Sequence, residues 1–487
     1  MGLVAPADPV PVAGLGAVHF TGIGGAGMSG IARVMLAAGV AVSGSDARHS
    51  PVLDELAAGG AAVHVGHDTS NLGAADTLVV STAIRPDNPE LAEARTRGLR
   101  VMHRGAALAS IMLGRRGIAV AGTHGKTTTS AMLTTVLQFC GADPGYVIGG
   151  TLVSSGLGAD QGTGELFVAE ADESDGSFLL LAPHAAIVTN VEPDHLDNYR
   201  GLQEIAAAFE RFAGRISPGG LLVTAADDPG ARALAVRAAA QAAAAGRGLL
   251  LRSYGEAAEA DYQVTRVTPR GMGVSFEVRA GQRQPFGINL GIPGRHNALN
   301  AAAAFAVAVE LGFPADEVAA GLAAFAGTHR RMELKGTADG VRVLDSYAHH
   351  PTELAADLRT ARDVAGGAGP GNGRVIAVFQ PHLYSRTRIF AAELGAALGL
   401  ADEALVLDVY AAREDPEPGV TGRLVADAVP GGRGQFTPDA GAVPGVVAGI
   451  AKPGDLVLTM GAGDVTALGP LIVAAVRERH GGRRRGP

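Results

Sequence analysis

Apolar residues in this chain of 487 residues occur mainly in short runs of strand length, separated by stretches of helical or turn character. The runs expected to form strands are Ala17–Thr21, Val40–Ser43, Ala62–Val65, Thr77–Ser81, Ile118–Ala121, Leu166–Ala169, Ala186–Val191, Val341–Leu344, Arg374–Phe379, Ala404–Leu407 and Asp455–Met460. Helices are expected at about Met28–Ala38, 231–248 and Ala298–Leu311. Strands that alternate with helices build parallel sheets with helices packed on them, so the pattern predicts an α/β protein.

The stretch Gly117–Ser130 has the order strand, glycine-rich loop, helix. Glycines let backbone N–H groups approach phosphate oxygens, and the helix that follows directs its positive end at them. Only two residues separate Gly122 from Gly125, where the common phosphate-loop pattern has four, but Gly-Lys-Thr in this setting still favours ATP over a plain glycine turn. The residues expected to contact ATP here are Gly122, Thr123, His124, Gly125, Lys126, Thr127 and Thr128.

Length and composition restrict the class of protein. A chain of this length predicts about three domains. The net charge of −8 and the lack of any aromatic–basic stretch argue against nucleic-acid binding, and no uninterrupted apolar run is long enough for membrane insertion. The single cysteine, Cys140, and an N-terminus without a secretory signal are typical of a cytoplasmic protein.

The first predicted strand leads into Gly22-Ile-Gly24-Gly25-Ala-Gly27, and an acid, Asp46, follows about 20 residues later. This is the fingerprint of a Rossmann-like domain, in which a diphosphate lies at a helix N-terminus. NAD and a UDP-sugar both carry a diphosphate that can bind at such a helix N-terminus, so the motif by itself does not decide between them. Ser81 and Thr82 follow another strand, at the sheet edge where ligands bind in such folds.

Acidic side chains gather after the strand Leu166–Ala169, in the segment Glu170–Asp175. Beside a phosphate loop they predict a Mg²⁺ site, because Mg²⁺ prefers hard oxygen ligands, although a solvated acidic turn has the same composition. His195 follows the next strand between Asp194 and Asp197, and local sequence leaves its role open between a metal or phosphate ligand and a structural histidine.

The last third of the chain again alternates strand and helix, with polar clusters at three strand ends. The clusters are Asp345–Pro351, Gln380–Arg386 and Asp408–Glu414. Strand ends of one parallel sheet share an edge, so the three clusters together predict a site. Upstream, Gly294-Arg295-His296-Asn297 precedes a predicted helix, where the polar side chains either face a nucleotide or cap the helix.

With these motifs in place, the sequence resembles the Mur ligase family from Gly22 to Asp464, and its alanine-adding branch in particular. The most specific segments are Gly22–Gly30, Gly122–Thr129, Glu170–Asp175, Thr189-Asn190 with Asp194-His195, Tyr347–Glu353 and Asp408–Glu414. The resemblance implies three domains: a UDP-sugar-binding Rossmann-like domain (1–113), a central P-loop ATPase-like domain (114–327) and a C-terminal Rossmann-like domain that binds the amino acid (328–487).

The activity implied by the resemblance is ATP-driven amide synthesis. ATP would phosphorylate the lactyl carboxylate of UDP-N-acetylmuramate, and the amine of L-alanine would attack the acyl phosphate. Because two anions must approach each other, Lys126 and Mg²⁺ would offset their repulsion.

Site residues are implied by the same resemblance. Thr127, Glu170 and His195 would hold metal, and His296, Asn297, Arg331 and Asp345 would contact ATP. His349 and Arg386 would hold the amino acid and the carboxylate, so the catalytic set is Lys126, His195, Arg331, His349 and Arg386. The sugar nucleotide would contact Gly22, Gly24, Gly25, Gly27, Met28, Ser45, Asp46, Ser81 and Thr82. The resemblance leaves monomer and homodimer equally open.

Three positions depart from the family pattern. Relatives usually carry Asp directly before Tyr-Ala-His, where this chain has Ser346, although Asp345 is adjacent. Many relatives have Arg at the position of Leu383. Other Mur ligases use a carbamylated lysine at the position of Phe209, and its absence fits the alanine-adding branch.

Other functions remain to be separated. A murein-peptide ligase would share all the ATP chemistry, and the Met28-Ser29-Gly30 and Asp408–Glu414 segments favour the alanine enzyme over it. An NAD-dependent oxidoreductase leaves Lys126 and Glu170 without a role, and a non-catalytic nucleotide-binding regulator does not need the C-terminal clusters.

Overall fold

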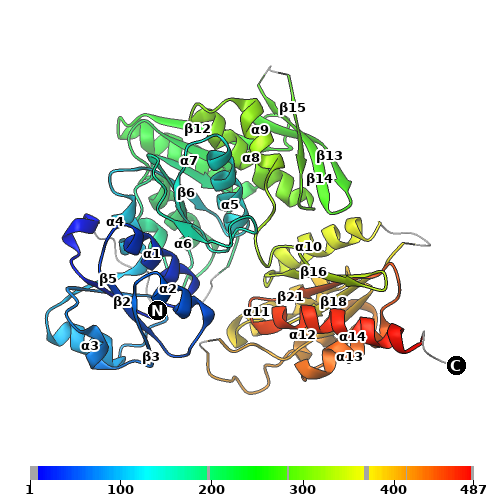
Figure 1. Cartoon of the computed structure of the whole chain (residues 1–487). Helices are drawn as coiled ribbons and strands as arrows, with labels where there is room; N and C mark the ends of the chain where they lie inside the picture. The colour runs from blue at the N-terminus through cyan, green and yellow to red at the C-terminus, as the bar shows by residue number, and fades with distance from the viewer. Residues whose placement is uncertain (1–8, 195–197, 282–283, 367–371, 413, 484–487) are drawn as a thin grey trace. The chain divides into compact units, whose positions relative to one another are not determined.

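The computed structural model describes residues 9–194, 198–281, 284–366, 372–412 and 414–483 (Figure 1). The chain divides into two compact units. The first comprises Met1–Arg266, Phe276–Ile288 and Leu299–Ala326, and the second comprises Val267–Ser275, Asn289–Ala298 and Gly327–Pro487. None of the described helices is both long and apolar enough to cross a membrane.

The first unit begins with a parallel five-stranded sheet in the order β3-β2-β1-β4-β5. Its strands are β1 (Val18–Thr21), β2 (Val42–Asp46), β3 (Ala62–Val65), β4 (Thr77–Val80) and β5 (Arg100–His103). Its helices are α1 (Ala26–Ala37), α2 (Pro51–Ala58), α3 (Pro89–Thr96) and α4 (Arg104–Met112). The predicted Rossmann-like arrangement is confirmed, since the glycine loop joins β1 to α1 at the carboxyl edge of the sheet.

A larger sheet follows, in the order β15-β14-β13-β12-β11-β10-β6-β9-β7-β8. Its strands are β6 (Arg116–Ala121), β7 (Gly145–Val147), β8 (Ala159–Asp160), β9 (Leu166–Glu170), β10 (Ala185–Val188), β11 (Gly220–Ala225), β12 (Leu249–Gly255), β13 (Tyr262–Arg270), β14 (Gly273–Ala280) and β15 (Phe286–Leu290). The helices of this part are α5 (Lys126–Phe139), α6 (Leu202–Ala213), α7 (Pro229–Ala244), α8 (Arg295–Glu310) and α9 (Ala315–Ala323). The parallel strands β6, β9 and β10 lie at its centre, which places the ends of three strands around the phosphate loop.

Helix α4 joins the two sheets of the first unit into one core. Every residue of α4 from Gly105 to Met112 is buried. Leu108 and Ile111 belong to one apolar cluster with Ile31 of α1 and Phe178 of the 3₁₀ turn Ser177–Leu180. The two parts therefore share buried apolar surface, which explains why they form a single unit.

The second unit is built on a six-stranded sheet in the order β16-β17-β21-β18-β19-β20, parallel except for β16. Its strands are β16 (Glu333–Ala338), β17 (Val341–Ser346), β18 (Val375–Phe379), β19 (Glu403–Val406), β20 (Gly434–Phe436) and β21 (Leu456–Met460). Its helices are α10 (Pro351–Val364), α11 (Tyr384–Leu398), α12 (Arg423–Asp427), α13 (Val443–Ile450) and α14 (Leu468–Arg483). Alternate residues of β18 enter two apolar clusters, one with α10 and α11 and one with α13 and α14, so helices cover both faces.

Two predicted boundaries were wrong for reasons that concern the site. Strand β10 ends at Val188 rather than Val191, because Thr189 and Asn190 turn to bind the phosphate loop. Helix α8 begins at Arg295 rather than Ala298, so His296 and Asn297 lie in its first turn and not in the preceding loop.

Candidate active site

The phosphate loop needs glycine at the two positions that the motif supplies. Gly122 has φ +133°, and a Cβ there would lie 2.0 Å from Thr189 Oγ1. Gly125 has φ +82°, and a Cβ there would lie 2.7 Å from Asn300 Oδ1. A larger residue at either position would therefore be strained and would collide with the side chains that hold the loop.

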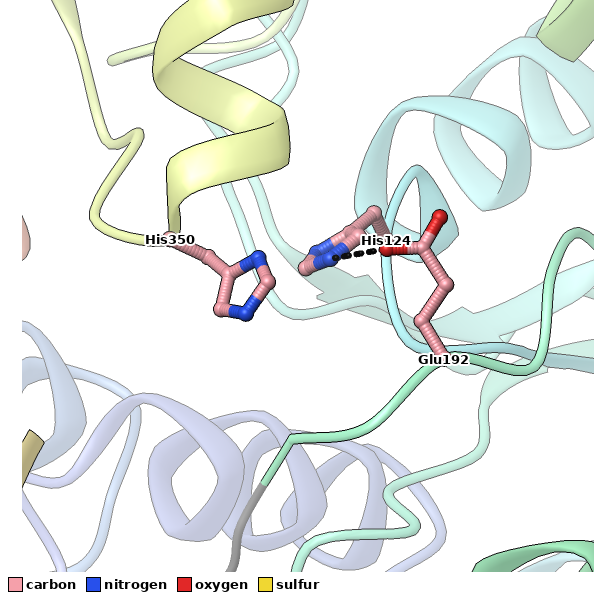
Figure 2. A group of neighbouring side chains, drawn as sticks. All are labelled: His124, Glu192 and His350. Atoms are coloured by element: carbon pink, nitrogen blue, oxygen red, sulfur yellow. Dashed lines mark ion pairs between the residues drawn. The ribbon is translucent and has the colours of Figure 1, made fainter. Parts of the chain in front are cut away.

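Thr189 and Asn190 fix the middle of the loop. The Asn190 side chain accepts a hydrogen bond from the His124 backbone N–H at 2.8 Å, and the Thr189 hydroxyl donates to the His124 carbonyl. The ring of His124 lies 3.7 Å from the Glu192 carboxylate, an ion pair if the ring is protonated (Figure 2). The loop is thus held in place by residues at the end of the neighbouring strand.

The Lys126 ammonium is held inside the loop. Its Nζ donates to the carbonyls of Gly122 and Thr123 at 2.7 and 3.1 Å and to Glu173 Oε1 at 2.9 Å. Burial alone lowers the pKa of Lys126, but the carboxylates of Glu173, Asp172 and Glu170 raise it above its ordinary value. Lys126 is therefore a charged group at the start of α5.

Thr127 and Glu170 place a hydroxyl and a carboxylate next to each other, close to Lys126. The Thr127 hydroxyl donates to Glu170 Oε1 at 3.1 Å, and the backbone N–H of Gly149 donates to Glu170 Oε2 at 2.7 Å. A hydroxyl and a carboxylate at this spacing fit one Mg²⁺ that retains several waters. His195, the third predicted ligand, lies outside the described residues.

The glycine loop of the first sheet has the geometry of an anion site. Gly22 has φ +81°, and the Gly24 N–H donates to Asp46 Oδ2 at 3.0 Å. Gly25 is the N-cap of α1, and a Cβ on Gly27 would lie 3.0 Å from Arg104 Nη1. The first turn of α1 and the Arg104 guanidinium therefore face the same space.

Two predicted sugar-nucleotide residues have side chains turned away from that space. Met28 packs in the apolar core. The Ser45 hydroxyl is fully buried and donates to the Glu90 carboxylate at 2.7 Å. Thr82 lies toward the acidic segment, with its hydroxyl 3.4 Å from Asp175 Oδ2, and Ser81 accepts a backbone hydrogen bond from Ile84.

Arg104 is a site residue that sequence reasoning missed. Its guanidinium pairs with Asp172 at 2.5 Å and with Asp175 at 3.4 Å. It lines a cavity of about 250 Å³ together with Gly27, Glu170 and Asp172, over an apolar base. The base consists of Ile31, Leu108, Val147, Ile148, Phe178 and Leu181. The strand that precedes it, β5, was not among the strands expected from the sequence, so no sequence signal marked Arg104.

The three polar strand ends of the second unit meet at one edge, as predicted. The ring of His382, after β18, lies 5.9 Å from that of His349, after β17. The same ring stacks on Tyr410, after β19, also at 5.9 Å. Ser385 also donates to Glu414.

The basic residues of this edge are held by acids and aromatic rings. Arg331 lies over the Tyr347 ring, 5.3 Å from its centroid, and 3.8 Å from the Glu353 carboxylate. His349 Nδ1 lies 3.5 Å from Glu353. Arg386 is buried in the first turn of α11. Arg331 and His349 therefore share Glu353 as their acidic neighbour.

Asp345 lies deeper than an ATP contact would require. It is fully buried, its oxygens accept hydrogen bonds from Thr459 and Thr466 at 2.6 and 2.7 Å, and Arg330 is 3.6 Å away. In this state its carboxylate binds residues of the same sheet edge.

The three positions that depart from the family pattern differ in their structural surroundings. Leu383 is buried, with φ +69°, at the N-cap of α11. Phe209 is fully buried on α6 and packs edge-to-face on Phe178, at 5.2 Å, so this position belongs to the apolar core. Ser346 donates a hydrogen bond to Asp357 of α10.

Fold and site together define an ATP-dependent ligase, and the chain belongs to the Mur ligase family. The models for the family's catalytic, middle and glutamate ligase domains match residues 17–116, 120–308 and 330–463. The UDP-N-acetylmuramate–L-alanine ligase of Thermobifida fusca is 57% identical over 98% of this chain and 100% of its own length.

Solved structures agree with this assignment. The UDP-N-acetylmuramate–alanine ligase of Thermotoga maritima has a TM-score of 0.78 and 28% identity, over 96% of this chain and 99% of its own. The murein peptide ligase of Psychrobacter arcticus has a TM-score of 0.69 and 26% identity, over 95% of this chain and 98% of its own. The predicted three-domain α/β architecture is confirmed.

Proposed function

We propose that this enzyme joins L-alanine to the lactyl carboxylate of UDP-N-acetylmuramate, using ATP and an acyl-phosphate intermediate, in peptidoglycan precursor synthesis. The observation that carries the proposal is the cavity between Gly27 and Glu170. It leads from the helix N-terminus that suits a diphosphate to the carboxylate beside the ATP loop, which is the route a sugar nucleotide must take to bring a carboxylate to ATP.

In the proposed reaction, α1 and Arg104 hold the UDP diphosphate, and the apolar base of the cavity supports the sugar. The ATP phosphates replace Glu173 as the anionic partner of the Lys126 ammonium. The charge of Lys126 then stabilises the transferred phosphoryl group. Thr127 and Glu170 would hold Mg²⁺, with His195 as the further ligand expected from the sequence, and the ion would supply charge neutralisation between ATP and the carboxylate.

The remaining roles in the proposed reaction belong to residues of the second unit. Arg331, His296 and Asn297 contact ATP, while His349 and Arg386 hold L-alanine and the carboxylate. The amine of L-alanine attacks the acyl carbon, and phosphate leaves. Domains bounded at 113 and 327 perform these separate tasks, in a cytoplasmic enzyme that is a monomer or a homodimer and uses no nucleic acid.

The test is the mass of the product formed from UDP-N-acetylmuramate, ATP, Mg²⁺ and a mixture of amino acids. We expect one product, larger by one alanine residue, with ATP consumed in equal amount. Lys126→Ala serves as the inactive control. Parallel reactions offer a murein peptide or NADH. A product formed only with the peptide would identify a murein-peptide ligase instead, and NADH consumption without amide formation would overturn the ligase altogether.

A further inference from the structure

Glu90 is a buried carboxylate that ties together three segments at the carboxyl edge of the first sheet. It lies in the first turn of α3 and is fully buried. Its Oε2 accepts hydrogen bonds from the hydroxyls of Thr21 and Ser45, both at 2.7 Å. Its Oε1 accepts the Asn71 side-chain amide at 2.9 Å and the Asp68 backbone N–H at 3.4 Å. A carboxylate accepts about four hydrogen bonds, so the capacity of Glu90 is filled by the protein itself.

The two hydroxyls bonded to Oε2 belong to the residues that hold the glycine loop. Thr21 ends β1 directly before Gly22, and it pairs with Ser45 in the register of β1 and β2. The Ser45 backbone carbonyl accepts the N–H groups of Gly22 and Ile23 at 2.8 and 2.9 Å. The carboxylate of the next residue accepts the N–H of Gly24. Three consecutive N–H groups of the loop are therefore bonded to the end of β2, which is bonded in turn to Glu90.

The glycine loop leads directly into the cavity proposed for the sugar nucleotide. Gly25 is the N-cap of α1, and the first two residues of the helix, Ala26 and Gly27, line the cavity. The first N–H groups of a helix bind a diphosphate when the preceding loop directs them at it. A continuous chain of contacts thus runs from Glu90 to the helix end that faces the cavity.

Filling space in the core does not require a charge at this position. Burial of a carboxylate costs free energy that its hydrogen bonds must offset, and an apolar side chain would fill the same volume without that cost. A fully satisfied buried network does add one property, because it fixes a single arrangement of the groups that it joins. Asn71 extends this network to the segment after β3, since its amide also donates to the Gly66 carbonyl at 3.0 Å.

We propose that Glu90 is a positioning residue of the sugar-nucleotide site, which touches no substrate and acts through Thr21 and Ser45. It holds the glycine loop in the conformation that directs the N-terminus of α1 at the diphosphate, so that binding does not have to select this conformation from several. The inference rests on the proposed function for its ligand and adds a residue that prepares the site.

The test measures the affinity for UDP-N-acetylmuramate by calorimetric titration of the full chain, with and without a non-hydrolysable ATP analogue. Glu90→Gln should weaken the sugar nucleotide about tenfold, as expected for loss of hydrogen bonds to a charged group, and change the affinity for the ATP analogue little. Ser45→Ala removes only one hydroxyl, so it provides the same test if Glu90→Gln does not fold, and it should also weaken the sugar nucleotide. In the Glu90→Gln background, Ser45→Ala should add little further loss, because the two residues act in one network.

Asn71→Ala is the matched control. It removes a hydrogen bond to the same carboxylate, but from the oxygen that does not bind Thr21 and Ser45. We expect it to lower the melting temperature about as much as Ser45→Ala does and to leave the affinity for the sugar nucleotide nearly unchanged. A purely structural Glu90 would instead make the affinity follow the melting temperature in both variants.

Hydrogen exchange without any ligand tests the loop itself. In Glu90→Gln and Ser45→Ala, the amides of Gly22, Ile23 and Gly24 should exchange about tenfold faster or more, whereas those of α2 should not change. The proposal is overturned if Glu90→Gln binds the sugar nucleotide normally, if both ligands weaken equally, if Asn71→Ala matches Ser45→Ala in affinity, or if loop exchange is unchanged. Wild-type protein that does not bind UDP-N-acetylmuramate would overturn the proposed function instead, and loop exchange would still decide the role of Glu90.

Discussion

Glu173 Oε1 lies 2.9 Å from the Lys126 ammonium, so the residue that must meet the ATP phosphates is already neutralised by a buried carboxylate. ATP binding therefore exchanges one anionic partner of Lys126 for another. The position of Glu173 is also fixed through its backbone carbonyl, which accepts a hydrogen bond from the Tyr199 hydroxyl.

We predict that Glu173→Gln binds ATP more tightly than wild type, because the phosphates no longer compete with a full charge for Lys126. Lys126→Ala should reduce kcat at least ~10²-fold, but it also removes the ammonium that pairs with the buried Glu173 carboxylate, which destabilises the fold. The double variant Lys126→Ala, Glu173→Gln removes the buried negative charge as well. Its melting temperature should therefore lie near that of wild type, although the enzyme stays inactive. Measured ATP affinity and melting temperature check both statements; weaker ATP binding by Glu173→Gln would contradict them.

Arg104 should control the sugar nucleotide more than ATP. Arg104→Ala is expected to raise KM for UDP-N-acetylmuramate by roughly 10- to 100-fold, the cost of a lost charge-assisted contact, with KM for ATP changed little. Arg97→Ala removes the arginine at the C-terminal end of α3, which pairs with Glu93 at the surface, and is the control. Equal effects on both substrates would indicate that Arg104 only supports the acidic segment.

Buried Glu90 makes the first sheet sensitive to acid. Burial alone would raise its pKa, but hydrogen bonds from four side chains lower it to about 2. These are His19, Ser45, Asn71 and Thr21. Since the folded pKa lies below the ordinary 4.5, the stabilisation is complete above pH 4.5 and is lost as pH falls toward 2.

The shift corresponds to about 3 kcal/mol. Glu90→Gln should lower the unfolding free energy at pH 7 and flatten its dependence on pH between 5 and 2. Hydrogen exchange of β1 and β2 measures this locally, with Glu93→Gln, a partly exposed acid on the same helix, as control. An unchanged pH dependence in Glu90→Gln would show that other groups govern acid unfolding.

His195 remains a predicted metal ligand. If it binds Mg²⁺, His195→Ala should lose activity, recover partly with high Mg²⁺ or with Mn²⁺, and keep its melting temperature; in wild type, metal affinity should weaken below about pH 6.5 as the ring gains a proton. A lower melting temperature without rescue would indicate a structural histidine. Loss of one limb of the pH–rate profile with unchanged metal dependence would indicate a proton carrier.

Local chemistry made much of this site readable from the sequence. The phosphate loop, the acidic segment and the glycine loop each lie within a short stretch whose backbone and charge requirements are fixed by neighbours in the chain, so Gly122, Lys126 and Glu170 could be named in advance. Parallel strands also share an edge, which allowed the clusters of His349 and His382 to be expected together.

Contacts between distant segments could not be read in this way. Arg104 belongs to no motif, and it becomes a site residue only because the buried helix α4 presents it to Asp172. Asp357 likewise belongs to no motif, and its hydrogen bond from Ser346 joins α10 to the end of β17. Ser45 and Met28 were assigned by position in a motif, and the direction of a side chain depends on packing that the motif does not encode.

Helix α4 sets a practical limit on exchanging parts between ligases. A Cβ on Gly105 would lie 2.8 Å from Ser177 Cβ, so the helix and its receiving surface fit without spare volume. A chimera cut near residue 113 would place a foreign α4 against a surface shaped for this one. Successful recombination of sugar-nucleotide specificity therefore requires α4 and the turn Ser177–Leu180 to be transplanted as one piece.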